Sequence, residues 1–356
     1  MLIALCVNGL AVHAQDAAVT QLGPAMMHPA EVHGCALSAD GKWAATGCAD
    51  HKLRLWDTAT GKLHGEPLDH DGGVYPVAFS PDSSMVVGGS DKGAKLWDVA
   101  SGKLIATFAH PGFVYSLAFR RDGKAVLCSS HDGPKDGTAR LWEVPGGKLI
   151  HEIDNKQRFY AVAFSPDGTR AAVSGNGNTV HLLDGITGKS MGIELTHQGS
   201  VRSLSFSPDS TRLLAGSLDK TGRVWDVTTG RAVTPPLEHT DQVRAAVFNP
   251  KGTSVLTGSM DKTARIWDAA TGKALTPPLT NPTGVRCVAF SPDGKLVATG
   301  CYGNTAQVWD AQTGKPVGAP IQHGGLVRAI VFGPDSRVLL TASFDKTARQ
   351  TRITPP

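Results

Sequence analysis

The 356-residue sequence predicts an all-β protein made of eight copies of one four-stranded antiparallel sheet. The first observation behind this prediction is a Trp-acid pair that recurs every 41 to 45 residues. The second is a turn sequence of the Ser-Pro-Asp type in most periods, and the third is the series of short apolar stretches between the turns. A fixed period of this length is typical of folds that repeat one supersecondary unit.

The Trp-acid pair marks the end of the third strand in each unit. Six units carry it, at Trp56-Asp57, Trp97-Asp98, Trp142-Glu143, Trp225-Asp226, Trp267-Asp268 and Trp309-Asp310. Leu183-Asp184 fills the gap in unit four, and Thr351 lies one period after Trp309. The chain therefore contains eight units.

The other elements follow in the same order within each unit. A His or Asn begins the unit, and a first strand such as VRSLSFSPD at 201–209 ends in a turn, because Pro presets φ and Asp bonds its own backbone. A second strand such as LVATGC at 296–301 precedes the strand that ends at the Trp. The Pro residues in KALTPPL at 273–279 indicate a fourth strand at a sheet edge, where a missing N–H costs least.

Four short antiparallel strands repeated eight times predict the blades of a β-propeller spanning residues 18–356. The recurring His, Ser-Pro-Asp-Gly, Ser-x-Asp-Lys-Thr and Trp-Asp elements resemble the WD40 family, in register across residues 21–353. The near-identical repeats look most like those of bacterial WD40 proteins. Seven blades is the commoner number in the family, so seven blades plus an extra repeat is the alternative.

The ends of the chain indicate how the ring closes. The sequence stops just after the third strand of unit eight, at residues 348–353, so that blade lacks its fourth strand. QLGPAMMH at 21–28 aligns with PVGAPIQH at 316–323, a fourth strand with its His. We therefore expect an N-terminal outer strand to complete the last blade, which removes an exposed sheet edge.

Residues 1–17 allow two interpretations. The apolar run from Leu2 to Val12 and the small residues that follow are those of a signal peptide, although no Lys or Arg precedes them. Alternatively, QDAA at 15–18 resembles WDAA at 267–270 and is the remnant of an earlier repeat. A cytoplasmic and an exported location both remain open.

The resemblance implies a hydrogen-bonded network in each blade, because a buried indole N–H requires an acceptor. The matching sets are His197, Ser217, Asp219 and Trp225; His239, Ser259, Asp261 and Trp267; and His70, Ser90, Asp91 and Trp97. A Ser, His and Asp also build nucleophilic sites, but one reaction does not need a copy in every repeat. The network is therefore interpreted as architecture, and units four and seven, which lack most of it, should be the loosest.

Composition and motifs point away from other functions. The net charge of +4 is too small to imply nucleic acid, and no stretch is long and apolar enough to span a membrane. The six cysteines form no C-x-x-C pair, and no phosphate, dinucleotide, zinc-protease or kinase motif occurs. We expect no metal, no cofactor and no enzymatic activity.

By the same resemblance, the His loops and Asp turns share one face of the ring, on which partners bind near the central channel. Two variable sets of positions are expected there: Arg202, Arg244, Arg286, Arg328, Tyr75, Tyr115 and Tyr160 after the leading apolar residue, and Leu218, Met260, Tyr302 and Phe344 before the turn Asp. Tyr, Arg and Met are frequent at binding hot spots. We expect an acidic or phosphorylated peptide over blades five to eight. The alternative is that the arginines are repeat consensus, paired with neighbouring acids.

The sequence thus favours a monomeric, non-enzymatic scaffold for protein–protein interaction. Two other functions stay open. One is a regulatory module of a larger signalling protein such as a Ser/Thr kinase, and the other is a propeller that binds a small ligand in its central channel.

Overall fold

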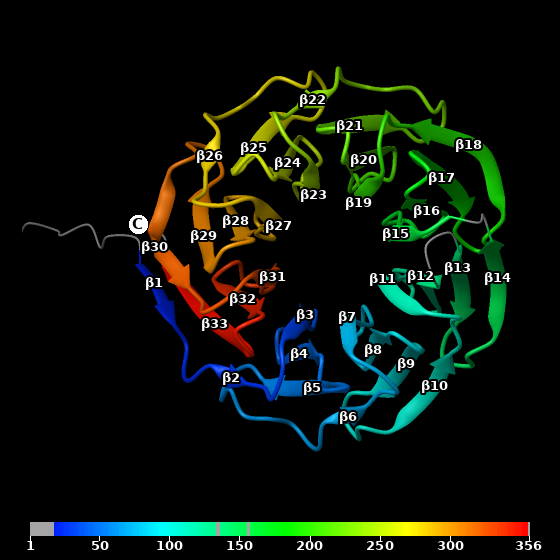
Figure 1. Cartoon of the computed structure of the whole chain (residues 1–356), viewed down its shortest axis with the longest axis vertical. Helices are drawn as coiled ribbons and strands as arrows, with labels where there is room; N and C mark the ends of the chain where they lie inside the picture. Colours follow the sequence, from blue (N-terminus) through cyan, green and yellow to red (C-terminus); the bar gives the residue numbers. More distant parts are fainter. Residues whose placement is uncertain (1–17, 133–135, 155–156, 355–356) are drawn as a thin grey trace, which may run out of the picture.

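The structure is a computed structural model that describes residues 18–132, 136–154 and 157–354. In these ranges the chain forms 33 strands and no helix, and the strands make eight antiparallel sheets around one axis (Figure 1). The predicted eight-bladed propeller is confirmed, and the seven-bladed alternative does not apply. Residues 1–17, the signal-like segment or repeat remnant, lie outside the described residues.

The first four blades run from the innermost to the outermost strand in chain order. Blade one contains β3 (Val32–Leu37), β4 (Trp43–Cys48), β5 (Lys52–Asp57) and β6 (Leu68–Asp69). Blade two contains β7 (Val74–Phe79), β8 (Met85–Ser90), β9 (Gly93–Asp98) and β10 (Leu104–Phe108). Blade three contains β11 (Phe113–Phe119), β12 (Ala125–Asp132), β13 (Asp136–Glu143) and β14 (Leu149–Asp154). Blade four contains β15 (Phe159–Phe164), β16 (Arg170–Gly175), β17 (Thr179–Asp184) and β18 (Ser190–Thr196).

The second half of the ring repeats this order. Blade five contains β19 (Val201–Phe206), β20 (Arg212–Ser217), β21 (Thr221–Asp226) and β22 (Leu237–Glu238). Blade six contains β23 (Val243–Phe248), β24 (Ser254–Ser259), β25 (Thr263–Asp268) and β26 (Leu279–Thr280). Blade seven contains β27 (Val285–Phe290), β28 (Leu296–Cys301), β29 (Thr305–Asp310) and β30 (Pro316–Gln322). Blade eight contains β31 (Val327–Phe332), β32 (Val338–Ser343) and β33 (Thr347–Thr354), with β1 (Ala18–Gln21) and β2 (Met26–Met27) outside them.

The Asp of each Ser-Pro-Asp turn holds the turn through its carboxylate. In unit five, Asp209 Oδ1 accepts hydrogen bonds from Ser207 Oγ at 2.5 Å and from the N–H of Thr211 at 3.1 Å. Ser210 adopts a positive φ of 62°, where unit seven has Gly294 at 73°. The repeated turn sequence therefore fixes the hairpin between the first two strands, as predicted.

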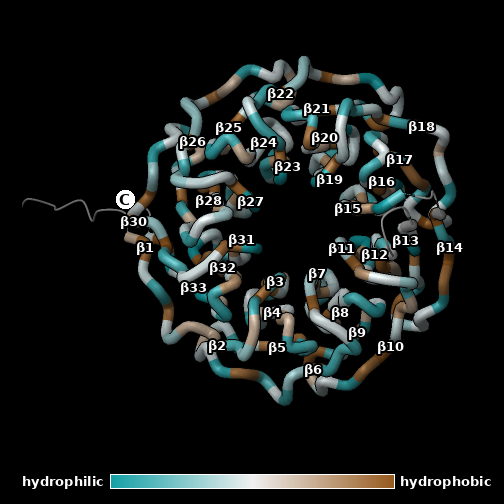
Figure 2. Tube along the Cα trace, viewed as in Figure 1, coloured by the Kyte–Doolittle hydropathy of each residue, from teal (hydrophilic) through white to brown (hydrophobic). Residues whose placement is uncertain are grey.

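The hydrophobic core is divided among the eight boundaries between blades. Each cluster of buried apolar side chains combines residues of two neighbouring blades, as when Leu55 of blade one packs in one cluster with Trp97 of blade two. Figure 2 shows hydrophobic residues spread around the whole ring rather than gathered in one layer. Each blade therefore depends on both of its neighbours for burial, as in other repeat folds.

The N-terminal segment closes the ring, which confirms the predicted outer strand. β1 runs antiparallel to β33, with Ala18 paired to Thr354 and Gln21 to Thr351, and β2 continues with Met26 opposite Ala348 (Figure 1). The strand starts three residues earlier than the repeat alignment indicated and is split in two. Val19 packs against the core between blades seven and eight.

The boundary between blades eight and one has the smallest core. Its cluster holds five buried residues, against eight to ten at the other boundaries. Gln350 occupies the buried strand position that is Leu55 in blade one and Val308 in blade seven, and its Nε2 has no hydrogen-bond partner among the described residues. A hollow of about 410 Å³ lies beside it, partly walled by Leu22 and Leu37.

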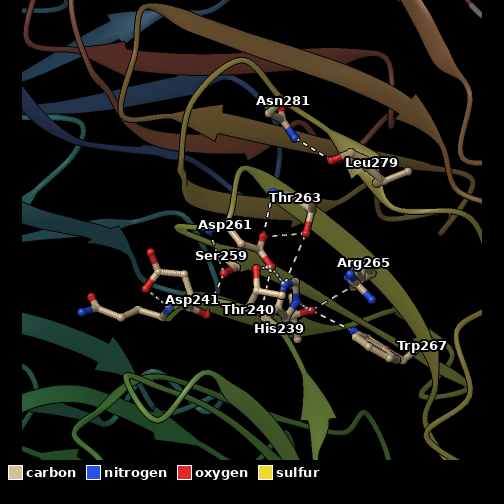
Figure 3. A network of polar contacts seen from close by, with 12 residues as sticks. His239, Thr240, Asp241, Ser259, Asp261, Thr263, Arg265, Trp267, Leu279 and Asn281 are labelled. Atoms are coloured by element: carbon tan, nitrogen blue, oxygen red, sulfur yellow. Dashed lines mark hydrogen bonds and ion pairs between the residues drawn. The ribbon is translucent and has the colours of Figure 1, made fainter.

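The predicted polar network is most complete in blade six, where it forms a directional chain (Figure 3). Trp267 Nε1 donates to Thr257 Oγ1 at 2.8 Å, and that hydroxyl contacts His239 Nε2 at 2.8 Å. His239 Nδ1 in turn lies 2.9 Å from Asp261 Oδ2. Since Nδ1 must donate to the carboxylate, Nε2 accepts from the Thr hydroxyl. Every polar atom along this chain has a partner.

Ser259, which the expected set includes, is not the partner of the indole, because Trp267 Nε1 donates to Thr257. Ser259 Oγ donates to the carbonyl of Asp241 at 2.9 Å and accepts from the N–H of Asp261 at 3.1 Å, so it fastens the loop after His239 to the turn. Ser217 of blade five has the same role, with the carbonyl of Gly199 at 3.0 Å and the N–H of Asp219 at 3.1 Å. The acceptor for the indole is the residue two positions earlier, which lies on the same face of the strand.

Blade five lacks this acceptor because Ala215 stands where blade six has Thr257. His197 Nδ1 lies 3.0 Å from Asp219 Oδ2. However, Trp225 Nε1 and His197 Nε2 are both buried, and neither has a partner within the described part of the chain. The expected link from Trp225 to the rest of the network is therefore absent.

Blade two departs further from the prediction, because Gly88 occupies the Thr position. Trp97 Nε1 donates directly to His70 Nε2 at 3.3 Å. Ser90 Oγ donates to the carbonyl of Gly93, and no hydrogen bond or ion pair of the described residues joins Asp91 to His70. The one-residue deletion in this turn moves the Asp out of the network.

Blade seven keeps its network, contrary to our expectation. Trp309 Nε1 donates to Thr299 Oγ1 at 3.0 Å, and Thr299 donates to Asn281 Oδ1 at 2.7 Å. Cys301 Sγ, at the Ser position, also lies 3.4 Å from Asn281 Oδ1. An Asn amide oxygen thus replaces the His nitrogen as acceptor.

Burial keeps three histidines of the network, His28, His70 and His110, uncharged. Burial lowers the pKa of His28 and His70 to about 4 and that of His110 to about 3, with neighbouring cations acting in the same direction. Burial alone would raise the pKa of Asp261, but hydrogen bonds from Thr263 and His239 outweigh it and bring that pKa to about 2. These three imidazoles are therefore neutral, and the carboxylate of Asp261 is ionised, at neutral pH.

Two substitutions test the corrected network: one removes the Thr acceptor of blade six, and the other introduces a Thr acceptor into blade five. Thr257→Val keeps the side-chain volume but leaves Trp267 Nε1 and His239 Nε2 unpaired, so we expect unfolding to become easier by about 1–3 kcal/mol. Ala215→Thr supplies the acceptor missing in blade five and should stabilise by about 1 kcal/mol. Urea denaturation measures both. No loss in the first variant together with no gain in the second would contradict the network.

Acid should destabilise the ring in two stages. A histidine whose pKa is near 4 in the folded protein has a pKa near 6.5 in the unfolded chain, so as the pH falls it is protonated in the unfolded chain before it is protonated in the folded one. Its contribution to stability is therefore complete above about pH 6.5 and is lost as the pH falls to about 4. Asp261 and Asp345, with pKa values of about 2, cause a further loss between about pH 4 and 2. Melting temperatures across this range test the sign.

Replacing one network histidine by Asn measures how much that histidine contributes to the loss of stability at low pH. His28→Asn copies the Asn281–Thr299–Trp309 arrangement of blade seven onto Thr46 and Trp56 of blade one, so it should flatten the stability profile between pH 6.5 and 4. A wild-type profile that is flat over this interval would refute the assignment.

Removing residues 1–27 tests ring closure. The deletion exposes β33 and removes the buried Met26, so we expect a lower melting temperature and self-association through the free edge. Adding a peptide of residues 18–27 should restore both properties. An unchanged melting temperature in the deletion, measured by scanning calorimetry, would show that these strands do not close the ring.

Candidate functional site

Each first strand contains a β-bulge at the variable residue that follows its leading apolar residue. The pairing register with the second strand shifts there in all eight blades, for example between Val201 and Ser203, which leaves Arg202 out of the ladder. The same shift occurs in each of the other blades. The bulged residues are His33, Tyr75 with Pro76, Tyr115, Tyr160, Arg202, Arg244, Arg286 and Arg328.

We call these bulged residues the axial ring, because the first strands face the axis of the propeller (Figure 1). A bulge turns a side chain away from the direction set by the pleat, and bulges are frequent beside functional sites. Charges of all four arginines act on Tyr115, which belongs to blade three, so side chains from distant blades converge at one end of the axis.

Aromatic side chains form one half of the axial ring. His33 lies between Phe344 and Tyr75, with ring centroids 4.8 and 4.6 Å away. Tyr75 contacts Phe113 at 4.1 Å, and Tyr115 contacts Tyr160 at 5.3 Å. These tilted contacts hold the rings of blades eight, one, two, three and four in a continuous arc.

Arginines of blades five to eight form the other half. The guanidinium of Arg202 lies 3.6 Å from the centroid of Tyr160, which joins the two halves. Arg244 Nη2 donates to Gln242 Oε1 at 2.6 Å. Each of the four arginines is half-buried.

None of these arginines is paired with an acid of the described residues. The ion pairs formed within residues 18–132, 136–154 and 157–354 include neither Arg202, Arg244, Arg286 nor Arg328. The alternative expectation, that they pair with neighbouring carboxylates, is therefore wrong. The axial ring has an excess of positive charge on one side.

The charge excess affects the groups around it. Burial and then the charge of Arg286 lower the pKa of Arg328 to about 10. Burial alone would raise the pKa of Tyr115, but Arg286, Arg328, Arg202 and Arg244 together hold it below its ordinary value. Burial and the like charge of Arg286 thus both disfavour the charged form of Arg328, whereas the four arginines together favour the ionised form of Tyr115.

The residues before the turn Asp lie beside the axial ring. The N–H groups of Leu218, Met260, Tyr302 and Phe344 donate to the carbonyls of Ser200, Gln242, Gly284 and Leu326. Each of those carbonyls belongs to the residue two positions before the bulged arginine of the same blade. We call these four half-buried side chains the rim. Backbone hydrogen bonds thus fix the rim and the arginines relative to one another.

Sequence reasoning missed one member of the aromatic arc, Phe113. It begins β11 and lies between Tyr75 and His131, with ring centroids 4.1 and 5.3 Å away. The signal was present in the sequence, because Phe113 precedes the leading apolar Val114 where units two and five have Gly73 and Ser200.

The buried Ser and His pairs are not arranged for nucleophilic catalysis. In blade three, His110 Nδ1 lies 3.0 Å from Ser130 Oγ. His110 Nε2 accepts the N–H of Trp142 at 3.2 Å, so Nδ1 carries the proton and donates to the Ser. This imidazole cannot take a proton from Ser130 as a general base.

Other chemistry finds no support in the parts of the chain that are described. No group of three or more His, Cys, Asp or Glu side chains there could hold a metal ion. The same residues include no helix that is long and apolar enough to cross a membrane.

Two family models match the sequence. The model of the IFT122 first beta-propeller matches residues 158–352, more than half of the chain. The model of the WD domain, G-beta repeat, matches residues 26–57, 61–98 and 102–143. Together the two models match strands from all eight blades.

Relatives among characterised proteins match over short stretches. Telomerase protein component 1 of Mus musculus is 34% identical over 108 residues, which are 30% of this chain and 4% of that protein. WD repeat-containing protein 1 of Gallus gallus is 34% identical over 23% of this chain and 14% of its own length. The p21-activated protein kinase-interacting protein 1-like of Danio rerio is 31% identical over 27% of each. The chain thus spans a small part of these relatives.

These relatives are eukaryotic, so the expected likeness to bacterial WD40 proteins is not supported. A solved structure, that of the computationally designed Ika8 protein, superposes with a TM-score of 0.82 at 24% identity. The superposition covers 94% of this chain and 99% of the designed one, and it bears on the fold alone. From the matched repeats and the ring of eight blades, the chain belongs to the WD40-repeat β-propeller family.

Proposed function

We propose that this propeller is a non-enzymatic protein–protein interaction scaffold whose partner binds over the rim and the axial ring. Proteins of the WD40 family generally mediate protein–protein interactions. The observation that supports the proposal here is the gathering of the variable Tyr, Arg, Met and Phe residues of the repeats at one end of the axis. Residues of these types dominate binding energy at interfaces.

The surface is suited to binding because it is held rigidly before a partner arrives. The bulges fix the direction of the arginines, and hydrogen bonds between backbone atoms fix the rim. A surface that needs no rearrangement loses little conformational entropy on association. The aromatic arc offers apolar contact area close to the charges of the arginines.

The unpaired arginines favour an acidic or phosphorylated segment of the partner, lying over blades five to eight. Guanidinium groups form bidentate hydrogen bonds with carboxylates and phosphates. Because no acid of the described chain occupies Arg202, Arg244, Arg286 or Arg328, a partner would not have to displace an internal ion pair.

Substitution of the rim tests the proposed binding surface. Met260→Asp with Tyr302→Asp places two carboxylates in the rim without touching the arginines, and we expect it to reduce captured partner at least tenfold by lost apolar contact and repulsion. Affinity capture from native extract, quantified by mass spectrometry, measures the loss.

The matched control is Ile186→Asp with Leu275→Asp, which makes the same change at exposed apolar side chains outside the rim. It should capture partners as the wild type does, and melting temperatures should show that both proteins are folded. Equal capture by the rim variant and the wild type would place the interaction surface elsewhere.

A further inference from the structure

The four arginines of the axial ring form a cluster of like charges that no acid of the described residues neutralises. They come from consecutive first strands, β19, β23, β27 and β31, and each is half-buried. Arg244 donates to the neutral amide of Gln242, and Arg202 lies on the ring of Tyr160. The Nε atoms of Arg202 and Arg244 are buried, with no acceptor among the described residues.

Some arginines elsewhere in the structure have an acid partner. Arg54 contacts both carboxylate oxygens of Asp50, at 3.0 and 2.6 Å, and Arg140 contacts Glu152 at 2.8 Å. Arg120 binds Asp122 in the same bidentate way. Other half-buried arginines, such as Arg170, Arg223 and Arg265, also have no acid partner among the described residues, but each lies apart from the axial ring. What distinguishes the axial ring is that four unpaired guanidinium groups gather around Tyr115, and this concentration of like charge points to an external anion.

We propose that Arg202, Arg244, Arg286 and Arg328, together with the hydroxyl of Tyr115, bind one compact oxyanion of the phosphate class at the end of the axis. This proposal rests on the proposed function in one respect, because it places the anion on the surface that receives the partner. It deepens that function by naming the chemical group recognised there.

The number and type of donors favour phosphate over carboxylate. A phosphate monoester carries nearly two negative charges at neutral pH and three acceptor oxygens, whereas a carboxylate carries one charge and two oxygens. Four guanidinium groups offer a fork of donors each, which matches several oxygens at once. Lysine, which binds phosphate as a point charge, does not occur in the axial ring.

The backbone geometry explains why these side chains converge. Each arginine is the bulged residue of its strand, so it leaves the ladder at an equivalent height in four neighbouring blades. The charges of all four reach Tyr115 on blade three, which places this hydroxyl with them. A single small group can therefore contact several blades, whereas an extended chain would cross them one by one.

Phosphate in this position could belong to a free small molecule or to a phosphorylated residue of the partner. Both sources present the same tetrahedral group to the arginines. The experiment therefore compares inorganic phosphate and pyrophosphate with a pool of degenerate phosphoserine peptides and its unphosphorylated counterpart.

The test compares wild-type protein with Arg286→Gln/Arg328→Gln and with the control Arg231→Gln/Arg337→Gln, which removes two exposed arginines outside the axial ring. Binding is measured by calorimetry and thermal shift at constant ionic strength, with acetate as the carboxylate probe. We expect phosphate and pyrophosphate to raise the melting temperature of the wild type and the control, acetate to have little effect, and the axial variant to bind at least tenfold more weakly.

Without added anion, the axial variant should melt at the same temperature as the wild type or higher, because it relieves repulsion between Arg286 and Arg328. A lower melting temperature would mean that the arginines are needed for folding, and it would overturn the proposal. Equal responses to acetate and phosphate, or an unchanged phosphate response in the axial variant, would also overturn it.

The peptide arm identifies the source of the phosphate. Tighter binding of the phosphoserine pool than of inorganic phosphate assigns the site to a phosphorylated partner, and the reverse order assigns it to a free anion. If partners are captured normally while the wild type responds to neither probe, the interaction scaffold stands and the phosphate site does not.

Discussion

The antiparallel pairing of β1 with β33 is the constraint on which the rest of the structure depends. The core of this protein is divided among eight boundaries, so no blade has a complete core unless its two neighbours are present. An open chain of blades would leave two incomplete boundaries and a bare sheet edge. Closure by residues from the start of the sequence turns this series into a ring, and only a ring brings the first strands of all blades to a common axis.

The sequence predicted the architecture well because each period contains the residues that define one blade, and the same pattern recurs eight times. Trp225, Trp267 and the other repeated residues located the third strands, and the missing fourth strand of unit eight identified the closing segment. The polar network was predicted less well. Thr257 and Ser259 both present hydroxyls on one face of β24, and the choice between them depends on their depth in the blade, which periodicity does not give.

The candidate site was likewise predictable in part. Variation at one position against a constant background selected Arg202, Tyr115 and their equivalents, because residues that hold the blades together cannot vary freely. The bulge itself was not predictable, since it is a property of the register between two strands and carries no residue type of its own. The clustering of the arginines could not be predicted either. Arg202, Arg244, Arg286 and Arg328 come from distant parts of the sequence, and only the closed ring brings them near Tyr115.

The register of the closing strand also determines where anything joined to the propeller would emerge. Ala18 of β1 is paired with Thr354 of β33, so the two ends of the described chain lie side by side on the two outermost strands of blade eight (Figure 1). Polypeptide attached at either end leaves from the same point on the circumference. A segment attached there would join the propeller at its outer circumference and would leave both faces of the ring accessible to solvent.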